Sequence, residues 1–552
     1  MKSSRAFLQG RRPELVTAAV GGAVVLFVQT RLSRAGIQPY GYDGAQYIEH
    51  AARLRAVRAM QEIGAHGLRG ALAEADGDYP PAVHLLTSCL AWIGGHDALA
   101  AARTSVLWLL LIAAASALIA WRIDGRRATA AAAAIGCLLV PALHGASARY
   151  YYDLPFLALL WVLVPVGLAT WDRRPLAGGL AVGGLWLLAC LTKWTAIPLG
   201  GVAALAVAVG PGPADRRRRG IAFVTASLAV AIGVGLWVRM IGDLGSLGGM
   251  LANWVGTLGG EGGGSGGLGG LVASGAAAVV GLDPLARLQY YGLALVLSIL
   301  SPLLAGLAVL LGGVWLVRGG RGAPALAVLA GGQLAFAAVG VAVFDERFVL
   351  GMAPAFAVAG ALGWAQLPER GRVVAGALVV ALGLLVGLEA QHGIPATTAP
   401  VRLIENRAPD SFPNASRGIW VSDSIERRGW GHWDPADEGE RDRLEALWAA
   451  VVATRPAAVL VVGDPDLDTA ALDSAWFGYR ALLAAVRGEP QIGSVTFGHD
   501  CGDADLLVRR VDPRTGPASP CAAPWTLQQV LPAGDGSFDV SFWVPASRAA
   551  GR

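Results

Sequence analysis

The chain has 552 residues, of which 54% are hydrophobic and only 15% charged, and its mean hydropathy is +0.51. Soluble domains carry about 25% charged residues, so this composition excludes a soluble protein and indicates an integral membrane protein. The net charge of +4 is small and comes from short basic loops, which argues against a nucleic-acid-binding protein.

Apolar stretches predict an α-helical polytopic membrane protein with about eleven transmembrane helices, since one crossing takes roughly 20 apolar residues. The first stretch follows Arg11-Arg12 and lacks a signal-peptide cleavage site, so we interpret it as a retained span. The predicted spans are 13–31, 104–121, 128–145, 154–171, 176–191, 195–211, 220–241, 291–317, 323–343, 349–366 and 372–390.

Every second connection between these spans is basic. By the positive-inside rule the basic connections are cytoplasmic, which places the N-terminus inside and the C-terminus outside. The cytoplasmic connections contain Arg11-Arg12, Arg122 to Arg127, Arg173-Arg174, Arg216 to Arg219, Arg318 to Arg321 and Glu369 to Arg372. The outer connections are then 32–103, 146–153, 192–194, 242–290, 344–348 and the tail after about 391.

The first outer loop, 32–103, has helical patterning. Ala45 to Ile63 alternates apolar and charged faces, which is typical of a helix that lies on the membrane surface. Tyr79-Pro80-Pro81 then interrupts the helical pattern, and its prolines predict the start of an apolar helix over 82–93. We expect His84 on this helix to be an interface residue and not a ligand.

Residues 242–290 are glycine-rich and too flexible in composition to form a core. Two interpretations stay open for this outer loop. It is either a connector or a lid that orders when substrate binds.

The polar tail, 391–552, predicts a small α/β domain on the outer face, separate from a transmembrane domain over 1–390. Its apolar runs are short, as in soluble domains with buried strands. We predict helices over Arg441–Ala453 and Ala470–Val486, and strands over Ala457–Gly463 and Leu506–Val511.

The five cysteines do not form a zinc motif. Cys89, Cys137 and Cys190 lie in or near apolar segments and are expected to be small core residues. Cys501 and Cys521 lie in the tail, where an exported domain could join them in a disulfide, and the sequence leaves this open.

Four outer connections carry charged residues beside aromatic ones. They contain Tyr42-Asp43, Tyr150 to Asp153, Lys193-Trp194 and Asp345 to Arg347. A carboxylate at a membrane boundary is costly to desolvate and is seldom placed there without a role. Lys193 is the only lysine besides Lys2, which favours a requirement for an ammonium group at this position.

Several of these residues also have a structural interpretation. Asp153 could cap the helix that follows it, and Lys193 could extend to the membrane interface. Glu346-Arg347 could be an internal ion pair, while Tyr150 to Tyr152 and Trp194 could be belt aromatics at the interface.

The order of these motifs and their shared face resemble the C-type (GT-C) membrane glycosyltransferases, in particular the branch that contains the protein O-mannosyltransferases and the lipid A aminoarabinose transferases. The resemblance covers about residues 10–370. The matching elements are Tyr42-Asp43-Gly44-Ala45-Gln46-Tyr47, Tyr79-Pro80-Pro81, Arg149 to Pro155, Leu191-Thr192-Lys193, and Glu346-Arg347-Phe348 with Pro354. Asp43 is followed by glycine where many members have a second acidic residue, and this departure puts a metal site of paired carboxylates in doubt.

The resemblance implies an inverting transfer of a sugar from a polyprenyl-phosphate carrier to a protein, lipid or glycan acceptor on the outer face. It implies Asp43 as catalytic base, and Lys193, Arg347 and Arg149 as contacts to the donor phosphate. The substrate-binding residues it implies are Tyr42, Tyr152, Asp153, Trp194 and Glu346. No cofactor is assigned, and a divalent metal on Asp43 and Asp153 is left open.

Two other functions fit a polytopic protein. A transporter would carry polar groups near the bilayer midplane and often an internal repeat, and the predicted spans show neither. A non-catalytic anchor or assembly protein for glycolipid or polysaccharide would not need about eleven spans. The alanine-, glycine- and arginine-rich composition favours a bacterial inner membrane.

Overall fold

A computed structural model describes most of the predicted helices and part of the tail. The described residues are 80–89, 98–140, 142–143, 146, 152–211, 215–241, 246–248, 284–300, 302–339, 346–392, 448–454, 458–462, 494–497, 504–511, 525–532 and 539–549. The predicted span 13–31, the helices predicted over 45–63 and 470–486, and Cys501 and Cys521 lie outside these residues.

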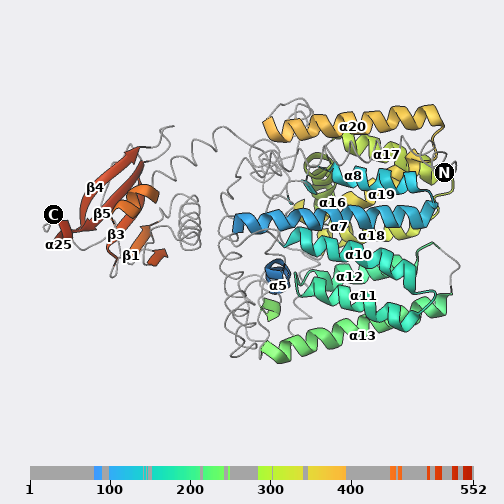
Figure 1. Ribbon diagram of the computed structural model, residues 1–552, viewed down its shortest axis with the longest axis horizontal. Coiled ribbons are helices and arrows are strands. Elements are labelled where there is room, and N and C mark those ends of the chain that lie inside the picture. The colour runs from blue at the N-terminus through green and yellow to red at the C-terminus, as the bar shows by residue number, and fades with distance from the viewer. Residues whose placement is uncertain are drawn as a thin grey trace, which may run out of the picture. The chain divides into compact units, whose positions relative to one another are not determined.

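The chain divides into two compact units, of which one holds the helical bundle and the other the sheet (Figure 1). The helices are α5 Ala82–Cys89, α7 Ala98–Asp124, α8 Arg127–Leu138, α10 Asp153–Thr170, α11 Pro175–Cys190, α12 Ala196–Ala208, α13 Arg216–Ile241, α16 Pro284–Ala294, α17 Pro302–Val317, α18 Ala323–Val339, α19 Met352–Trp364 and α20 Glu369–His392, with a π-helix η2 Leu295–Ile299 and a 3-10 helix η3 Glu346–Val349. Helices therefore occur at every predicted span from 104–121 onward.

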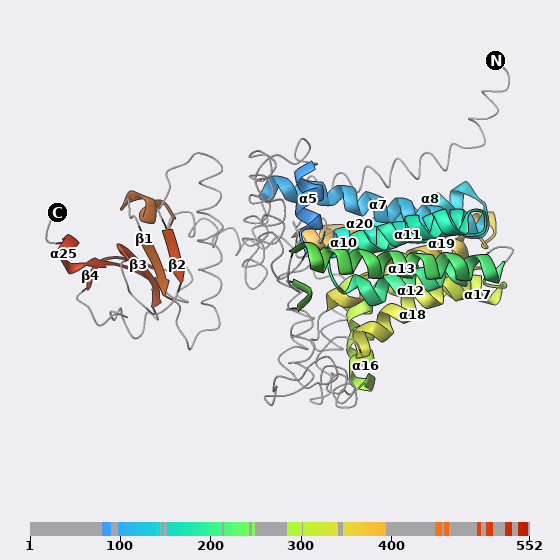
Figure 2. The same cartoon turned by 90° about the horizontal axis from the view of Figure 1, so that it is seen from below.

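One predicted span is wrong in detail. The stretch 291–317 is not a single helix, because α16 passes into η2, where Leu300 N donates to Leu295 O at 3.0 Å. The chain then starts again as α17 at Pro302, which has no N–H to continue the earlier helix. Figure 2 shows α16 leaving the direction of its neighbours α17 and α18.

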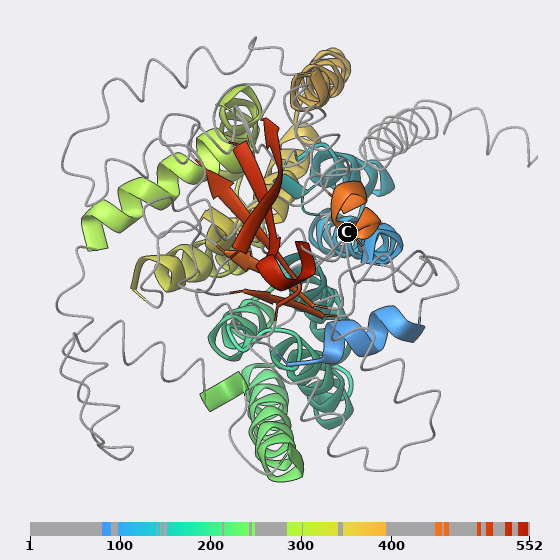
Figure 3. The same ribbon diagram turned by 90° about the vertical axis from the view of Figure 1, so that its left-hand side faces the viewer.

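Three described helices are long and apolar enough to cross a membrane: Thr104–Asp124, Asp153–Thr170 and Arg216–Ile241. Six further apolar helices of 10–17 residues accompany them. Among the three long helices, α13 lies at the edge of the bundle in Figure 3 and exposes Leu228, Ile232 and Leu236, which are four residues apart. An apolar face directed outward in this way is expected of a helix that contacts lipid.

The opposite face of α13 packs tightly on α11 through small residues. A Cβ added at Gly179 would lie 2.6 Å from Ala222 O, and one added at Gly183 would lie 2.9 Å from Ala226 O. Apolar side chains gain little by leaving lipid for a helix interface, so close backbone approach at glycine and alanine is a main source of association in membranes. This contact fixes the spacing of α11 and α13.

The basic turns gather at one end of the bundle, which we call the basic end, consisting of the turns after α7, α10, α12, α17 and α19 (Figure 1). Arg126 Nη1 donates to Ala365 O at 2.9 Å, and Arg318 Nη1 donates to Gln366 O. Because Asp153 begins α10 and Lys193 follows α11, these two residues lie at the other end, which we call the site end.

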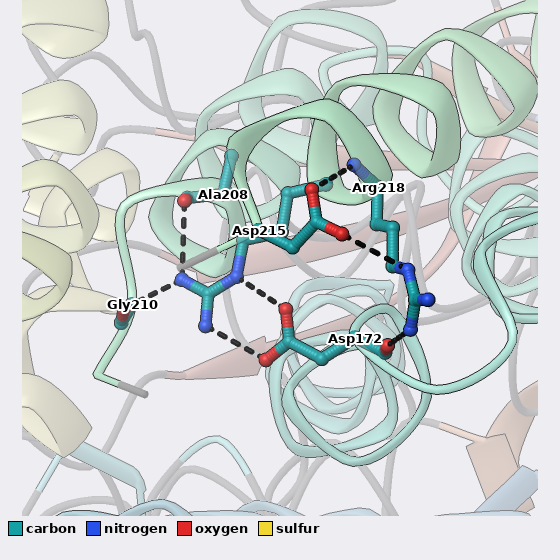
Figure 4. A network of polar contacts seen from close by, with 6 residues as sticks. Asp172, Ala208, Gly210, Asp215 and Arg218 are labelled. Carbon is teal, nitrogen blue, oxygen red and sulfur yellow. Dashed lines mark hydrogen bonds and ion pairs between the residues drawn. The ribbon is translucent and has the colours of Figure 1, made fainter. Parts of the chain in front are cut away.

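At the basic end, the buried guanidinium of Arg219 connects three segments (Figure 4). Its Nε and Nη2 each lie 2.9 Å from an Asp172 carboxylate oxygen, and its Nη1 donates to Gly210 O at 2.7 Å. This bidentate pair lowers the pKa of Asp172 below its ordinary value, chiefly through the hydrogen bond from Arg219. Arg218 extends the network to Asp215 at 2.9 Å.

The second unit holds a mixed five-stranded sheet in the order β2-β1-β3-β5-β4. Its strands are β1 Ala458–Val462, β2 Ser494–Phe497, β3 Leu506–Val511, β4 Trp525–Pro532 and β5 Asp539–Pro545. Strand β1 pairs in parallel with β2 and with the central β3, whereas β5 is antiparallel to β3 and β4. Strands β1 and β3 lie where the sequence predicts strands, because their runs are continuously apolar or alternate. The domain boundary near 391 and the outer location of this domain stay predictions.

Candidate functional site

Two of the predicted site residues form a buried ion pair. Asp153 is the first residue of α10, Lys193 lies in the turn between α11 and α12, and Lys193 Nζ is 2.5 Å from Asp153 Oδ1. Each residue is only 7% exposed. The N-cap position of α10 belongs to Tyr152 and not to Asp153, and the Lys193 ammonium is buried against the Asp153 carboxylate and does not extend into solvent.

The turn around Lys193 is held by its own backbone. Lys193 N donates to Ala189 O at 2.9 Å, and Ala196 N donates to Lys193 O at 2.9 Å, so α11 passes into α12 within a few residues. Trp186 Nε1 donates to Ala196 O at 2.7 Å and closes the same turn from α11. The position of the ammonium is thus set by a rigid connection between two packed helices.

A third predicted motif, Glu346-Arg347-Phe348 in η3, contacts the ion pair through Phe348. The Lys193 ammonium lies 5.7 Å from the centre of the Phe348 ring, a cation–π contact. Phe348 directly follows Glu346 and Arg347, whose side chains are outside the described part of the structure. The backbone of η3 brings this motif beside the Asp153–Lys193 pair.

The aromatic residues of the predicted site are enclosed. Tyr152 is 1% exposed and its hydroxyl is hydrogen-bonded to His84 Nε2 at 3.0 Å. Trp194 is 2% exposed and its Nε1 donates to Ser246 Oγ at 2.8 Å. The expectation that His84 is an interface residue is corrected, because His84 is fully buried against Tyr152. Sugar stacking by Tyr152 and Trp194 stays a prediction.

Sequence reasoning missed a buried cation on α16. Arg287 is 4% exposed, and its pKa is lowered from the ordinary value chiefly by burial, with Tyr291 acting in the opposite direction. Arg287 belongs to helix α16, which packs against η3, the element that contains Phe348. The signal in the sequence was a proline at 284 that starts a helix before the predicted span.

Asp43, Tyr42 and Arg149 lie outside the described residues, so their predicted roles stay predictions. Within the described ranges no group of three or more histidine, cysteine, aspartate or glutamate side chains could hold a metal. Asp153, the described member of the two suggested ligands, has an ammonium beside its Oδ1. A second cation on that oxygen would be repelled, and the suggested metal on Asp43 and Asp153 stays a prediction.

The sequence matches no protein-family model and no curated protein. Among solved structures, ArnT from Cupriavidus metallidurans in the apo state has a TM-score of 0.51 at 15% identity, covering 96% of this chain and 98% of that chain. The same protein bound to undecaprenyl phosphate has a TM-score of 0.51 at 14% identity, covering 95% and 97%. The archaeal oligosaccharyltransferase AglB from Archaeoglobus fulgidus has a TM-score of 0.44 at 12% identity, covering 90% and 70%, which is too low to support an argument. The likeness to ArnT confirms the expected GT-C fold.

Proposed function

We propose that the protein is an inverting glycosyltransferase that moves a sugar from a polyprenyl-phosphate carrier to an acceptor at the outer face of a bacterial inner membrane. The observation that carries this proposal is the Asp153–Lys193 pair, buried at the site end of the bundle. It supplies a fixed ammonium beside the Phe348 motif, in a fold shared with a protein solved with undecaprenyl phosphate. The site end is then the outer end of the bundle, as the basic turns at the other end favour.

The chemistry needs a base for the acceptor hydroxyl and cations for the departing phosphate. Asp43 accepts the hydroxyl proton as the acceptor oxygen bonds to the anomeric carbon. The bond from that carbon to the phosphate oxygen breaks, and its electron pair leaves with the polyprenyl phosphate. A single displacement inverts the configuration of the anomeric carbon.

Lys193, Arg347 and Arg149 face the negative charge that develops on the phosphate. A preorganised cation stabilises such charge most when little reorganisation is needed at the moment of reaction. Asp153 contributes by orienting Lys193, since its Oδ1 lies 2.5 Å from the ammonium. Tyr42, Tyr152, Trp194 and Glu346 line the substrate sites.

The test is transfer of a radiolabelled sugar from polyprenyl-phosphate donors by the purified full-length protein. We expect transfer by the wild type and loss of at least about 100-fold in Asp43→Asn, the range of general base catalysis. Asp215→Asn is the matched control, because Asp215 is a half-exposed carboxylate at the basic end. Equal rates in wild type and Asp43→Asn would remove Asp43 as base, and no transfer by the wild type from any of several donors would refute the proposal.

A further inference from the structure

Helix α5, in the predicted first outer loop, is hydrogen-bonded to the chain close to both members of the ion pair. Ala82 N donates to Leu191 O at 3.0 Å, two residues before Lys193 in the chain. The His84 imidazole is hydrogen-bonded through Nε2 to the Tyr152 hydroxyl at 3.0 Å, directly before Asp153. One helix of eight residues therefore touches the chain next to the carboxylate and next to the ammonium.

We propose that α5 positions the Asp153–Lys193 pair, and that His84, acting through Tyr152, is a positioning residue for the Lys193 ammonium. This inference rests on the proposed function, in which Lys193 faces the departing phosphate. His84 itself touches no reacting atom. Its effect passes through the backbone of Tyr152 to Asp153 and from the carboxylate to Lys193.

The geometry makes this bond a strong constraint. His84 and Tyr152 are 0% and 1% exposed, and their rings meet edge to face at 5.6 Å and 76°. A buried hydroxyl that loses its partner costs about 1–3 kcal/mol, so Tyr152 is expected to move if the imidazole is removed. Because Tyr152 is the N-cap residue of α10, its movement shifts Asp153, the next residue.

The lysine side chain depends on that carboxylate for its place. Lysine is a compact point charge on a flexible stem of four carbons, and an isolated lysine has many rotamers. Here the 2.5 Å contact with Asp153 and the ring of Phe348 select one position. Displacement of a reacting or stabilising group by about 1 Å is enough to lower a rate about 100-fold.

The position of α5 in the chain gives the contact a functional meaning. The same loop, 32–103, carries Asp43, the proposed base, before α5. The loop that supplies the base therefore also holds the pair that supplies the phosphate contact. We infer that α5 makes the alignment of Lys193 depend on the fold of this loop.

Lysine labelling tests the inference directly, because Lys2 and Lys193 are the only lysines in the chain. Full-length protein in lipid nanodiscs is treated with an amine-reactive N-hydroxysuccinimide ester, and mass spectrometry gives the labelling rate of each lysine. Lys2 is the internal reference for reagent and pH. Lys193 is expected to label slowly in the wild type, because it is 7% exposed and paired.

His84→Leu is expected to raise the Lys193 rate about tenfold relative to Lys2, from the loss of one buried hydrogen bond. Tyr152→Phe should raise it to a similar extent, and the double variant no further, because both remove the same bond. His84→Gln should restore slow labelling, since its amide can reach the hydroxyl. These comparisons separate the bond from the size of the side chain.

Thr87→Val is the matched control on the same helix. Thr87 is 1% exposed, and its Oγ1 has no hydrogen-bond partner among the residues the structure describes, so the swap removes a buried hydroxyl without breaking a bond. Wild-type labelling of Lys193 in His84→Leu would overturn the inference. Fast labelling in Thr87→Val would also overturn it, since any loosening of α5 would then suffice. If His84→Leu fails to fold, Tyr152→Phe alone decides.

Activity and carrier binding separate this inference from the proposed function. In the transfer assay His84→Leu should lower kcat with little change in the KM for the acceptor, because the ammonium acts on the departing phosphate. Undecaprenyl phosphate should protect Lys193 from the reagent in the wild type. Absence of both protection and transfer in the wild type would refute the proposed function, while the labelling of His84→Leu and Thr87→Val would still decide the role of α5.

Discussion

Removing one member of the Asp153–Lys193 pair should destabilise the protein more than removing both. At 2.5 Å and an effective dielectric constant of about 20, the attraction between the two charges is about 7 kcal/mol. Desolvation of two ions, several kcal/mol each, offsets most of that attraction, so the net contribution of the intact pair is small. Lys193→Met or Asp153→Asn alone leaves one charge buried and unpaired, which costs about 3–5 kcal/mol.

The double variant Asp153→Asn/Lys193→Met has no buried charge at this site and should lose less than about 2 kcal/mol. Unfolding in mixed micelles by increasing sodium dodecyl sulfate, followed by tryptophan fluorescence, gives the free energies. Asp215→Asn is the control, because its partner Arg218 is exposed by about half and such pairs contribute about 0–1 kcal/mol. If the double variant loses as much unfolding free energy as the two single variants together, the two charges are not coupled. If Lys193→Met loses as little unfolding free energy as Asp215→Asn, the Asp153–Lys193 pair is not buried.

Three further predictions concern the basic end and the helix interface. Arg219→Leu should lower stability by about 3–5 kcal/mol, because the buried guanidinium binds Asp172 and Gly210, with the acceptor KM unchanged in the folded fraction. Since the Asp172 pKa is lowered from its ordinary 3.8, its stabilisation is full above about pH 3.8 and is lost as pH falls through the folded pKa; unfolding midpoints between pH 7 and 2.5 should show this, with a flatter profile in Asp172→Asn. Gly183→Leu should abolish the contact at Ala226 and reduce the folded yield, whereas normal yield would contradict the close packing.

The positions of the helices could be predicted from the sequence because one physical quantity, apolar length, decides them. The alternation of basic turns also predicts that the two ends of the bundle differ. In the structure Asp153 and Lys193 lie at one end, and Asp172 lies at the other with the basic turns. The break within 291–317 could not be predicted this way. Its residues are apolar apart from Ser298 and Ser301 near the break, so the hydropathy pattern does not distinguish the π-helix, and Pro302 was the clearest local signal.

The site was predicted as separate motifs and not as contacts. Asp153 and Lys193 are 40 residues apart, and no periodicity connects the start of α10 with the end of α11. The packing of these two antiparallel helices brings the residues together. His84 was misjudged for the same reason, because a histidine in an apolar helix shows its partner only when α5 is placed against Tyr152.

The two ends of α10 show how a bundle of apolar helices can hold a polar site in register. In lipid, apolar contacts give helices little preference for one alignment over another. Polar contacts do: Asp153 joins the start of α10 to the turn after α11, and Asp172 joins its end to the start of α13. The glycine contacts at Gly179 and Gly183 then fix the spacing of α11 and α13 between these ends. Because three independent contacts define one register, loss of the Asp172–Arg219 pair should lower stability and leave Asp153 aligned with Lys193. Loss of the His84–Tyr152 hydrogen bond from α5 should instead disturb the alignment of Asp153 with Lys193.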